Sequence, residues 1–310
     1  MDTLAVVLKR PGTLDLQRLA LTAPSAADVV VDVEWTGISS GTERMLWSGR
    51  MPAFPGMGYP LVPGYESVGR VCEAGASSGR RVGERVFVAG ARCYESARAL
   101  FGGAAARLVV PGAKAHPVSD ALGARAILLA LAATAHHAIR GGVAPDLVVG
   151  HGVLGRLLAR LTMLDGGPAP TVWETQPARC AGATGYRVCA PADDPRRDYR
   201  SIYDASGDAS LLDTLVAHLG RGGELVLAGF YDRLSLAFAP AFQREVRLRV
   251  AAEFTPADLH AVIALANDGT LDLDGLVTHE RPATAAAEAY DLAFGDAACV
   301  KMALDWRRCA

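Results

Sequence analysis

The chain has 310 residues, which is long enough for two domains, and 51% of them are hydrophobic. Its 31 basic and 33 acidic residues leave a net charge of −2, which gives no electrostatic reason to expect nucleic acid or an anionic membrane as a partner. The six cysteines are scattered and form no C-x-x-C pair. This spacing argues against a structural zinc lobe and against a disulfide framework.

The N-terminus and the longest apolar stretch both predict a soluble protein. The N-terminus lacks a basic segment followed by an apolar one, so no secretory signal is predicted. The longest apolar stretch, residues 127–135, is short for a membrane span and is predicted to be a buried helix. We therefore expect reduced thiols, a cytoplasmic location and no integral membrane segment.

The first 115 or so residues have the pattern of β structure. Clusters of β-branched residues predict strands at residues 29–33, 68–71 and 85–88. Gly and Pro punctuate the sequence between them at short intervals. Many short strands with frequent turns predict an antiparallel, barrel-like domain.

The pattern changes near residue 120. Residues 122–139 are apolar all round, which is typical of a helix buried between layers. Strands and helices then alternate, which predicts a parallel sheet with right-handed crossovers. The predicted strands are residues 147–149, 171–173, 186–188, 201–203 and 224–228, with a helix beginning at Leu154.

The pattern changes again after about residue 252. Helices are predicted at residues 259–266 and 285–294, followed by a final strand at residues 300–304. We expect this tail to fold back onto the first domain. The predicted domains are residues 1–120, 121–251 and 252–310.

A glycine turn carries the clearest functional signal. Gly150-x-Gly152-x-x-Gly155 follows a predicted strand and opens a predicted helix, the context in which this motif binds a dinucleotide. The first glycine permits the tight turn, the second lets the pyrophosphate approach, and the third lets the helix pack close to the sheet. Free N–H groups at the helix N-terminus then meet the phosphates. The predicted binding residues here are Gly150, His151, Gly152, Val153, Leu154 and Gly155.

Glu174 ends the second strand of this domain, at the distance from the turn where a carboxylate accepts the ribose hydroxyls of NAD. It would repel the additional phosphate of NADP by about 4 kcal/mol at a separation of roughly 4 Å and intermediate dielectric. Arg179 complicates this interpretation because it could reach the adenosine ribose or a phosphate. We predict NAD rather than NADP as the cofactor.

Two later strand ends carry small residues that could contact the nicotinamide half. Ser206 follows the fourth predicted strand and Gly229 follows the fifth. Both are expected at the carboxyl edge of the sheet, where dinucleotides bind. Each could instead belong to an ordinary turn.

The order of these parts resembles the medium-chain dehydrogenase/reductase family. The matching motifs are TGIS at 36–39, PLVPGYE at 60–66, GERV at 83–86, the glycine turn, and LVTH at 276–279. The resemblance implies an α/β fold with a Rossmann doubly wound parallel sheet and a GroES-like β-barrel catalytic domain. It also implies that Thr134 contacts the nicotinamide, and it allows a homodimer through the edge strand of the sheet.

A narrower resemblance is to the bacteriochlorophyllide a dehydrogenases of phototrophic bacteria. It rests on GISSGTE at 37–43, LWSGR at 46–50 and FPGMGYP at 54–60. It implies NAD-dependent oxidation of a 3-(1-hydroxyethyl) group on a bacteriochlorin ring to 3-acetyl, a late step of bacteriochlorophyll a biosynthesis. Nothing in the composition or periodicity points to this substrate.

Zinc-using members of the family carry Cys where this chain has Ser39 and His where it has Tyr65. Only Glu66 remains of that pattern, and one carboxylate cannot hold the ion. His136 and His137 are adjacent on a helix, so they should diverge by roughly 100° and make a poor ligand pair. We therefore predict no metal site.

Without zinc, another group must stabilise the developing alkoxide and take its proton. Tyr65 is the first candidate as a hydrogen-bond donor, although an ordinary tyrosine pKa of about 10 makes it a poor base. Glu66 or His136 could pass the proton onward. The alternative is that Tyr65 is a packed aromatic residue with a satisfied hydroxyl.

Further small donors lie near this predicted site. Ser39 and Thr42 could donate hydrogen bonds to the substrate oxygen, or could be ordinary polar residues. Glu43 is better interpreted as a structural partner for a backbone N–H than as a catalytic residue.

A loop rich in Pro and Gly carries apolar side chains that a flat macrocycle would need. The alternatives are a dimer contact or a loop core. The residues are Trp47, Met51, Phe54, Met57 and Tyr59.

Two other functions compete with the dehydrogenase hypothesis. One is a zinc-free NAD(P)H-dependent enone or quinone reductase of the same family. The other is a catalytically inactive nucleotide-binding scaffold or sensor, which the loss of the zinc ligands makes conceivable.

Overall fold

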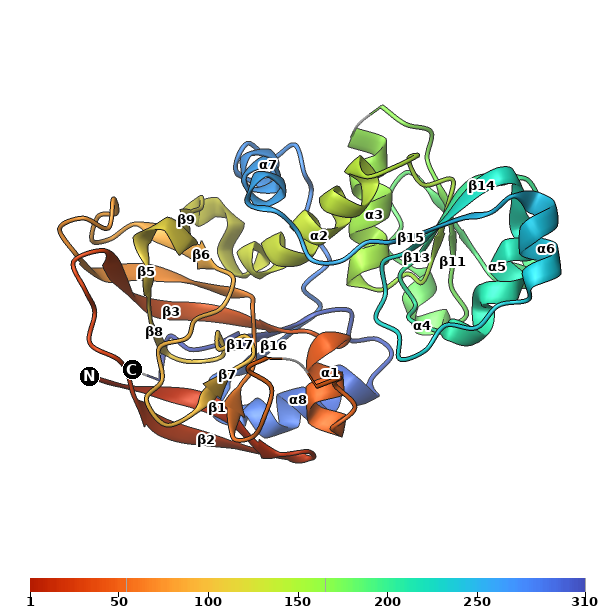
Figure 1. The fold of residues 1–310 in the computed structure, drawn as a ribbon. Coiled ribbons are helices and arrows are strands. Elements are labelled where there is room, and N and C mark those ends of the chain that lie inside the picture. Colours follow the sequence, from red (N-terminus) through yellow and green to blue (C-terminus); the bar gives the residue numbers. More distant parts are fainter. Residues whose placement is uncertain (54, 165, 310) are drawn as a thin grey trace. The chain divides into compact units, whose positions relative to one another are not determined.

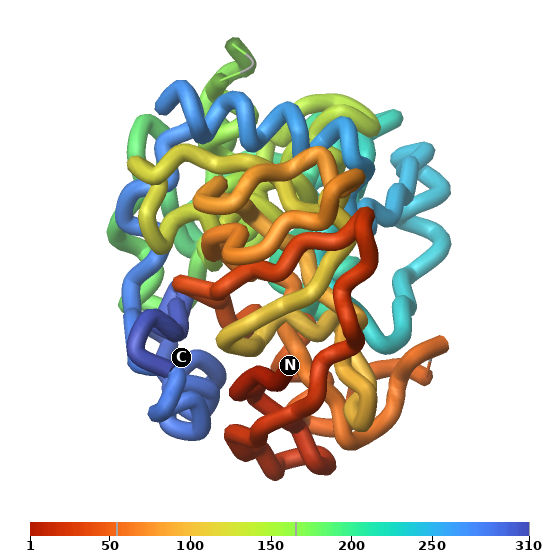
Figure 2. The backbone as a smooth tube through the Cα atoms, turned by 90° about the vertical axis from the view of Figure 1, so that its left-hand side faces the viewer, coloured from red at the N-terminus to blue at the C-terminus, as the bar shows by residue number. Residues whose placement is uncertain are grey.

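The computed structural model describes residues 1–53, 55–164 and 166–309. The chain divides into two compact units (Figure 1). One contains Met1–Ala130 and Leu273–Ala310, and the other contains Leu131–Asp272. Both chain ends therefore belong to the first unit, where the red and dark blue segments can be followed in Figure 2.

The larger sheet of the first unit is mainly antiparallel and has the order β16-β17-β3-β5-β6-β9, with β8 pairing on β3. The strands predicted near residues 29–33, 68–71 and 85–88 are confirmed as β3, β5 and β6. The C-terminal strand β17 pairs with β3, and Met302 lies opposite Ile38. The strands are β3 (Asp28–Ile38), β5 (Ser67–Ala74), β6 (Arg85–Val88), β8 (Arg107–Pro111), β9 (Ala115–Pro117), β16 (His279–Pro282) and β17 (Met302–Asp305).

A second sheet of this unit has the order β2-β1-β4-β7. Its strands are β1 (Asp2–Arg10), β2 (Thr13–Ala20), β4 (Leu61–Val62) and β7 (Arg98–Ala99), and the helices of the unit are α1 (Thr42–Ser48) and α8 (Ala286–Gly295). The helix predicted at residues 285–294 is confirmed as α8, which packs on β2 and β17. One apolar core joins these parts, including Val6, Val31, Tyr290 and Trp306. Burial of each such large apolar side chain contributes about 1.5–3 kcal/mol.

The second unit is built on a parallel sheet with the order β12-β11-β10-β13-β14-β15. This is the doubly wound order, in which the chain starts at a central strand and reverses direction once. The strands are β10 (Leu147–Val149), β11 (Thr171–Trp173), β12 (Arg187–Cys189), β13 (Tyr199–Asp204), β14 (Leu219–Leu227) and β15 (Arg247–Val250). The predicted α/β fold class is confirmed.

Helices lie between these strands, as the alternating pattern predicted. They are α2 (Leu129–Arg140), α3 (Val153–Leu164), α4 (Pro177–Cys180), α5 (Leu212–His218), α6 (Phe238–Arg244) and α7 (Pro256–Asn267). The edge strand β15 was not predicted, because its side chains are largely exposed and mix arginine with apolar residues.

The helix predicted over residues 122–139 is only partly confirmed. Residues Asp120–Leu128 form a 3-10 segment, η2, in which Gly123 has a φ of 51°, and the regular helix α2 begins at Leu129. Asp120–Arg140 is long and apolar enough to cross a membrane, judged by length and composition alone. Because 61% of that stretch is buried inside the protein, we interpret it as a core helix, as predicted.

The last helix before the tail belongs to the second unit. Asp258 of α7 accepts hydrogen bonds from His136, His137 and Arg140 of α2. These contacts attach α7 to the Rossmann unit, so the segment that joins the first unit begins at Leu273 rather than near residue 252. Sequence periodicity could identify this helix but could not assign its partner.

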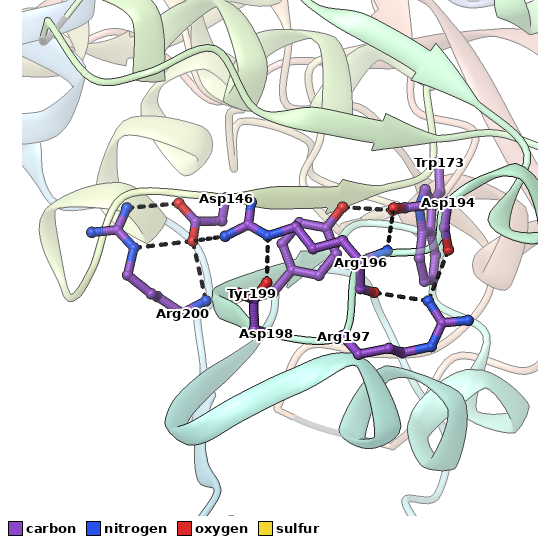
Figure 3. A network of polar contacts seen from close by, with 8 residues as sticks. All are labelled: Asp146, Trp173, Asp194, Arg196, Arg197, Asp198, Tyr199 and Arg200. Carbon is purple, nitrogen blue, oxygen red and sulfur yellow. Dashed lines mark hydrogen bonds and ion pairs between the residues drawn. The ribbon is translucent and has the colours of Figure 1, made fainter.

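A polar network joins the segment before β10 to the segment before β13 (Figure 3). Asp146, just before β10, accepts hydrogen bonds from Arg196 and Arg200. Asp194 accepts hydrogen bonds from the indole of Trp173 and the hydroxyl of Tyr199. These buried carboxylates are fully used as structural partners, and the glycine turn lies at the opposite, carboxyl end of the strands.

Candidate active site

The glycine turn has the geometry that its spacing predicted. Gly150 has a φ of 95°, and its N–H donates to the carbonyl of Trp173 in the neighbouring strand at 2.9 Å. A Cβ at Gly155 would collide with the carbonyl oxygen of Gly150, whereas a Cβ at Gly152 would meet nothing within 4 Å. The turn therefore needs Gly155 for packing and leaves open space beside Gly152, where a pyrophosphate can approach.

The helix that starts here supplies the hydrogen-bond donors. Val153 and Leu154 form the first turn of α3, whose leading N–H groups have no carbonyl one turn earlier to accept them. Such groups bind phosphate oxygens well, because the helix dipole adds positive potential at the same place. The residues present fit a dinucleotide.

Two other predicted residues converge on this turn. A Cβ at Gly150 would lie 3.3 Å from the backbone nitrogen of Ser206, and one at Gly229 would lie 2.6 Å from the nitrogen of Gly207. Asp204 holds this segment by accepting hydrogen bonds from both the N–H and the hydroxyl of Ser206. The structure thus brings together the ends of β10, β13 and β14, as the parallel topology requires.

Glu174 has a structural task besides the predicted one. Its buried carboxylate accepts N–H groups from His151 at 3.0 Å and from Thr175 and Gln176 at 2.8 Å. The carboxylate is therefore fixed against the glycine turn. Oε1 already accepts two N–H groups, whereas Oε2 accepts one and keeps a lone pair that can accept a ribose hydroxyl.

His151 differs from the expectation for a cofactor-contacting side chain. Its imidazole is fully buried; Nδ1 donates to the carbonyl of Arg179 at 2.6 Å and Nε2 accepts the hydroxyl of Tyr186 at 2.8 Å. Burial lowers the pKa of His151, which keeps the ring neutral. The ring is committed to the protein interior, and the backbone N–H and carbonyl of His151 bind Glu174 and Arg156, so contact between His151 and the cofactor stays a prediction.

Both histidines of α2 bind a single carboxylate. Nδ1 of His136 and Nδ1 of His137 each lie 2.9 Å from an oxygen of Asp258. Burial acts to raise the pKa of Asp258, but hydrogen bonds from Thr255 and these histidines hold that pKa well below its usual range. Each ring takes a different oxygen of the one carboxylate, and the prediction that the pair is poorly suited to bind a metal is not contradicted by this contact.

Three hydroxyl groups meet in the first unit where zinc-using relatives would hold the metal. Tyr65 donates to Oγ of Ser39 at 2.7 Å, and Thr42, the first residue of α1, is also within hydrogen-bonding reach of Tyr65. The ring of Tyr65 packs edge-on against Phe101. We call Ser39, Thr42 and Tyr65 the hydroxyl cluster.

The environment of Tyr65 favours a donor over a base. Burial, together with the negative charge of Glu66, raises the pKa of Tyr65 well above 10. The phenol therefore stays protonated at neutral pH. It can donate a hydrogen bond to a developing oxyanion, but it cannot itself serve as the final proton acceptor.

Glu66 is fully buried and forms an ion pair with Lys301, which is also buried. A Cβ at Gly37 would collide with the Glu66 carboxylate, so the pair lies directly against β3. A catalytic zinc needs three protein ligands, and here a protonated phenol, a serine hydroxyl and a paired carboxylate stand at the family's positions. These residues do not fit zinc, and no cluster of three His, Cys, Asp or Glu suited to a metal occurs in the described parts of the chain.

Glu43 is a structural partner, as expected. Its carboxylate accepts the N–H of Ser39 at 2.9 Å and the hydroxyl of Tyr290. Burial raises the pKa of Glu43 to about 7, although these hydrogen bonds oppose the shift. Glu43 thereby joins α1, β3 and α8 beneath the hydroxyl cluster.

The apolar residues predicted to line the substrate site lie mostly in a small core of their own. Met51 is buried there beside Leu46, with Met57 and Tyr59 packed at its edge. The ring of Trp47 lies tilted beside the ring of Phe294, and the Tyr59 hydroxyl donates to the carbonyl of Leu46. Phe54 lies outside the described residues. The loop-core alternative therefore accounts for much of this cluster, and pigment contact stays a prediction.

Comparison with known proteins identifies the chain. Residues 25–120 match the model of the alcohol dehydrogenase GroES-like domain. The chain is 55% identical over 311 residues to the 2-desacetyl-2-hydroxyethyl bacteriochlorophyllide A dehydrogenase of Rhodobacter capsulatus, with 99% of each chain covered. The chain belongs to the medium-chain dehydrogenase/reductase family. It is therefore an oxidoreductase of the alcohol dehydrogenase type, as predicted.

Two further comparisons agree. The 2-desacetyl-2-hydroxyethyl bacteriochlorophyllide A dehydrogenase of Cereibacter sphaeroides is 54% identical, with 100% of each chain covered. A short chain alcohol dehydrogenase from Escherichia coli CFT073, solved with NADH, is similar in fold, with a TM-score of 0.81, 21% identity and coverage of 98% of this chain and 99% of that one.

Several important side chains were missed at the sequence level. Three of them complete buried polar contacts: Lys301 with Glu66, Tyr290 with Glu43, and Arg156 with the carbonyl of His151. Lys301 lies 235 residues from Glu66 in the sequence, and no local spacing connects them. For Lys301, the sequence offered one signal, a single charged residue within an apolar segment.

Glu43→Gln should change the pH dependence of stability. A carboxyl pKa raised from 4.5 to about 7 stabilises the folded state below pH 4.5, and this contribution is lost as the pH rises through 7. The wild type should therefore lose up to about 3 kcal/mol from this group over that range, and the variant should lose none of it. Denaturant unfolding at several pH values measures the difference. Equal slopes for Glu43→Gln and the exposed control Glu73→Gln would contradict the shifted pKa.

Gly152→Ala should weaken dinucleotide binding without unfolding the turn. The new Cβ meets no protein atom within 4 Å but occupies the space where the pyrophosphate approaches. We expect the Kd for NAD to rise about tenfold or more, with an unchanged melting temperature. Gly155→Ala is the matched variant: its Cβ collides with the Gly150 carbonyl, so the melting temperature should fall. Unchanged NAD affinity in Gly152→Ala would exclude the turn as the phosphate site.

Proposed function

We propose that the protein is an NAD-dependent dehydrogenase that oxidises the 3-(1-hydroxyethyl) group of a bacteriochlorophyllide precursor to 3-acetyl, without zinc. The observation that carries this proposal is 55% identity over nearly the whole chain to a dehydrogenase named for that substrate. The hydroxyl cluster supports the metal-free part, since it occupies the place of the family's zinc ligands. The reaction belongs to a late stage of bacteriochlorophyll a biosynthesis.

The choice of NAD over NADP rests on Glu174. Its carboxylate is buried and held in place by three N–H groups beside the glycine turn. An ionised carboxylate at the end of this strand accepts ribose hydroxyls and repels a 2′-phosphate. The bound nicotinamide supplies the hydride acceptor for the oxidation.

The hydroxyl cluster would orient the alcohol and stabilise its oxygen. Tyr65 and Thr42 donate hydrogen bonds toward the alkoxide, and Ser39 holds the Tyr65 hydroxyl in place. Glu66 contributes through its charge and through its ion pair with Lys301 rather than by contact with substrate. Nδ1 of His136, the residue predicted to pass the proton onward, is bound to Asp258.

We also propose that the enzyme is a cytoplasmic homodimer formed through β15. This strand lies at the edge of the parallel sheet, and its Leu248 and Val250 are 46% and 65% exposed. An edge strand with exposed apolar side chains is prone to pair with another strand.

The decisive experiment mixes purified protein with NAD and a 3-(1-hydroxyethyl) bacteriochlorin. We expect the red absorption band of the pigment to shift as the acetyl group forms, with stoichiometric NADH. Saturable NAD binding with no pigment turnover would support the scaffold hypothesis instead. Preference for NADPH with a quinone or enone would support the reductase.

Tyr65→Phe should slow pigment oxidation at least about tenfold, because one well-aimed donor to an oxyanion is worth about 3 kcal/mol. NAD affinity should not change, since Tyr65 belongs to the first unit and the glycine turn to the second. Steady-state kinetics and a separate binding titration measure the two effects. Phe101→Leu, which alters the packing of the same ring without removing a donor, is the control. A wild-type rate in Tyr65→Phe would remove the phenol from the mechanism.

A further inference from the structure

The segment after β11 is fastened to the glycine turn by two buried side chains. The imidazole of His151 donates to the carbonyl of Arg179 at 2.6 Å. The guanidinium of Arg156, in the first turns of α3, donates to the carbonyls of His151 and Arg179 at 3.0 Å and of Ala181 at 2.8 Å. We call residues 175–182 the adenosine loop, because this segment follows Glu174, where the adenosine ribose is expected.

The adenosine loop buries little side-chain surface of its own. Its helix α4 is only four residues long and contains no buried residue. Thr175, Gln176 and Cys180 are exposed. A segment without an apolar face of its own keeps one conformation through polar contacts. Glu174 accepts the N–H groups of Thr175 and Gln176 at its start, and His151 and Arg156 bind the carbonyls of Arg179 and Ala181 further along.

Within the described residues, Arg156 is a buried arginine with no carboxylate among its hydrogen-bond acceptors. It is 4% exposed, and its hydrogen-bond acceptors are three backbone carbonyls. Burial lowers its pKa, the charges of Tyr186 and Glu174 act in the opposite direction, and Arg160 and Arg179 add to the lowering. A buried cation is costly unless its donors are all used, and here they fix three carbonyls at once.

The backbone of the adenosine loop is shaped to this guanidinium. Gly182 has a φ of 83°, and a Cβ there would collide with Nη1 of Arg156. His151 contacts both Glu174 and the adenosine loop: its N–H donates to the Glu174 carboxylate, and its ring donates to the carbonyl of Arg179. The ring is in turn held by the hydroxyl of Tyr186. His151 therefore holds both the Glu174 carboxylate, which is expected to bind the ribose, and the adenosine loop beside it.

We propose that His151 and Arg156 are positioning residues for coenzyme selectivity: they fix the adenosine loop against the glycine turn, so that Glu174 meets a ribose without a 2′-phosphate. This proposal rests on the proposed function, because it assumes that NAD binds at the glycine turn. A fixed loop binds NAD without an ordering penalty. A released loop would pay that penalty and would let Arg179 move toward a 2′-phosphate.

The test compares Arg156→Lys and Arg156→Met with wild type in titrations of NAD and NADP. Lys keeps the charge but lacks the planar fork of donors, and Met loses both. We expect the Kd for NAD to rise about tenfold in Arg156→Met, with a smaller rise in Arg156→Lys. The Kd for NADP should change less, so the preference for NAD should fall. Amide hydrogen exchange in residues 175–182 should become faster in both variants.

Arg160→Lys is the matched control. Arg160 is also buried on α3 but donates to the carbonyl of Asp272, away from the adenosine loop. It should leave the coenzyme preference unchanged, even if stability falls.

Three outcomes would overturn the proposal in distinguishable ways. Unchanged affinities and preference in both Arg156 variants would show that Arg156 serves stability alone. An equal loss of preference in Arg160→Lys would show a general effect of disturbing α3. Wild-type protein that bound neither coenzyme would remove the proposed function and this inference together. If Arg156→Met failed to fold, Arg156→Lys and the exchange measurement would still decide.

Discussion

The dinucleotide site depends on the close approach of α3 to the end of β10. Only glycine at position 155 permits it, since a Cβ there would enter the carbonyl of Gly150. This approach places the first N–H groups of α3 beside open space at Gly152. It also brings Arg156 onto the adenosine loop and the N–H of His151 onto Glu174. One steric constraint thus orders both the phosphate end and the ribose end of the site.

The hydroxyl cluster depends on different interactions, those of buried charged groups. Where zinc-using relatives would place a metal, this chain has three hydroxyl groups above two buried carboxylates. Lys301 balances the charge of Glu66, and Tyr290 and a backbone N–H satisfy Glu43. Burial, together with the charge of Glu66, keeps the phenol of Tyr65 protonated, which suits donation to an oxygen that becomes negative during alcohol oxidation. A metal supplies positive charge directly, whereas this arrangement supplies aligned hydrogen-bond donors.

Much of the second unit could be predicted from the sequence. The strands β10 and β11, the glycine turn and the alternation of strands with helices follow from local patterns: short apolar runs, glycine spacing and helical periodicity. The first unit was harder. β1 and β2 were missed, and the expected substrate loop proved to be partly a core in which Met51 is buried. Irregular strands and loops carry weak periodic signals, because their burial is set by distant segments.

The sequence alone determined the glycine turn, the alternating α/β order and the absence of the family's zinc-ligand types at residues 39 and 65. These depend on residue identity at fixed short spacing. The tertiary structure alone decided that Lys301 pairs with Glu66, that Asp258 joins both histidines of α2, and that Arg156 binds the adenosine loop. These contacts join residues that are up to 235 positions apart, and buried charges choose partners by position in the folded core, which short-range sequence patterns do not encode.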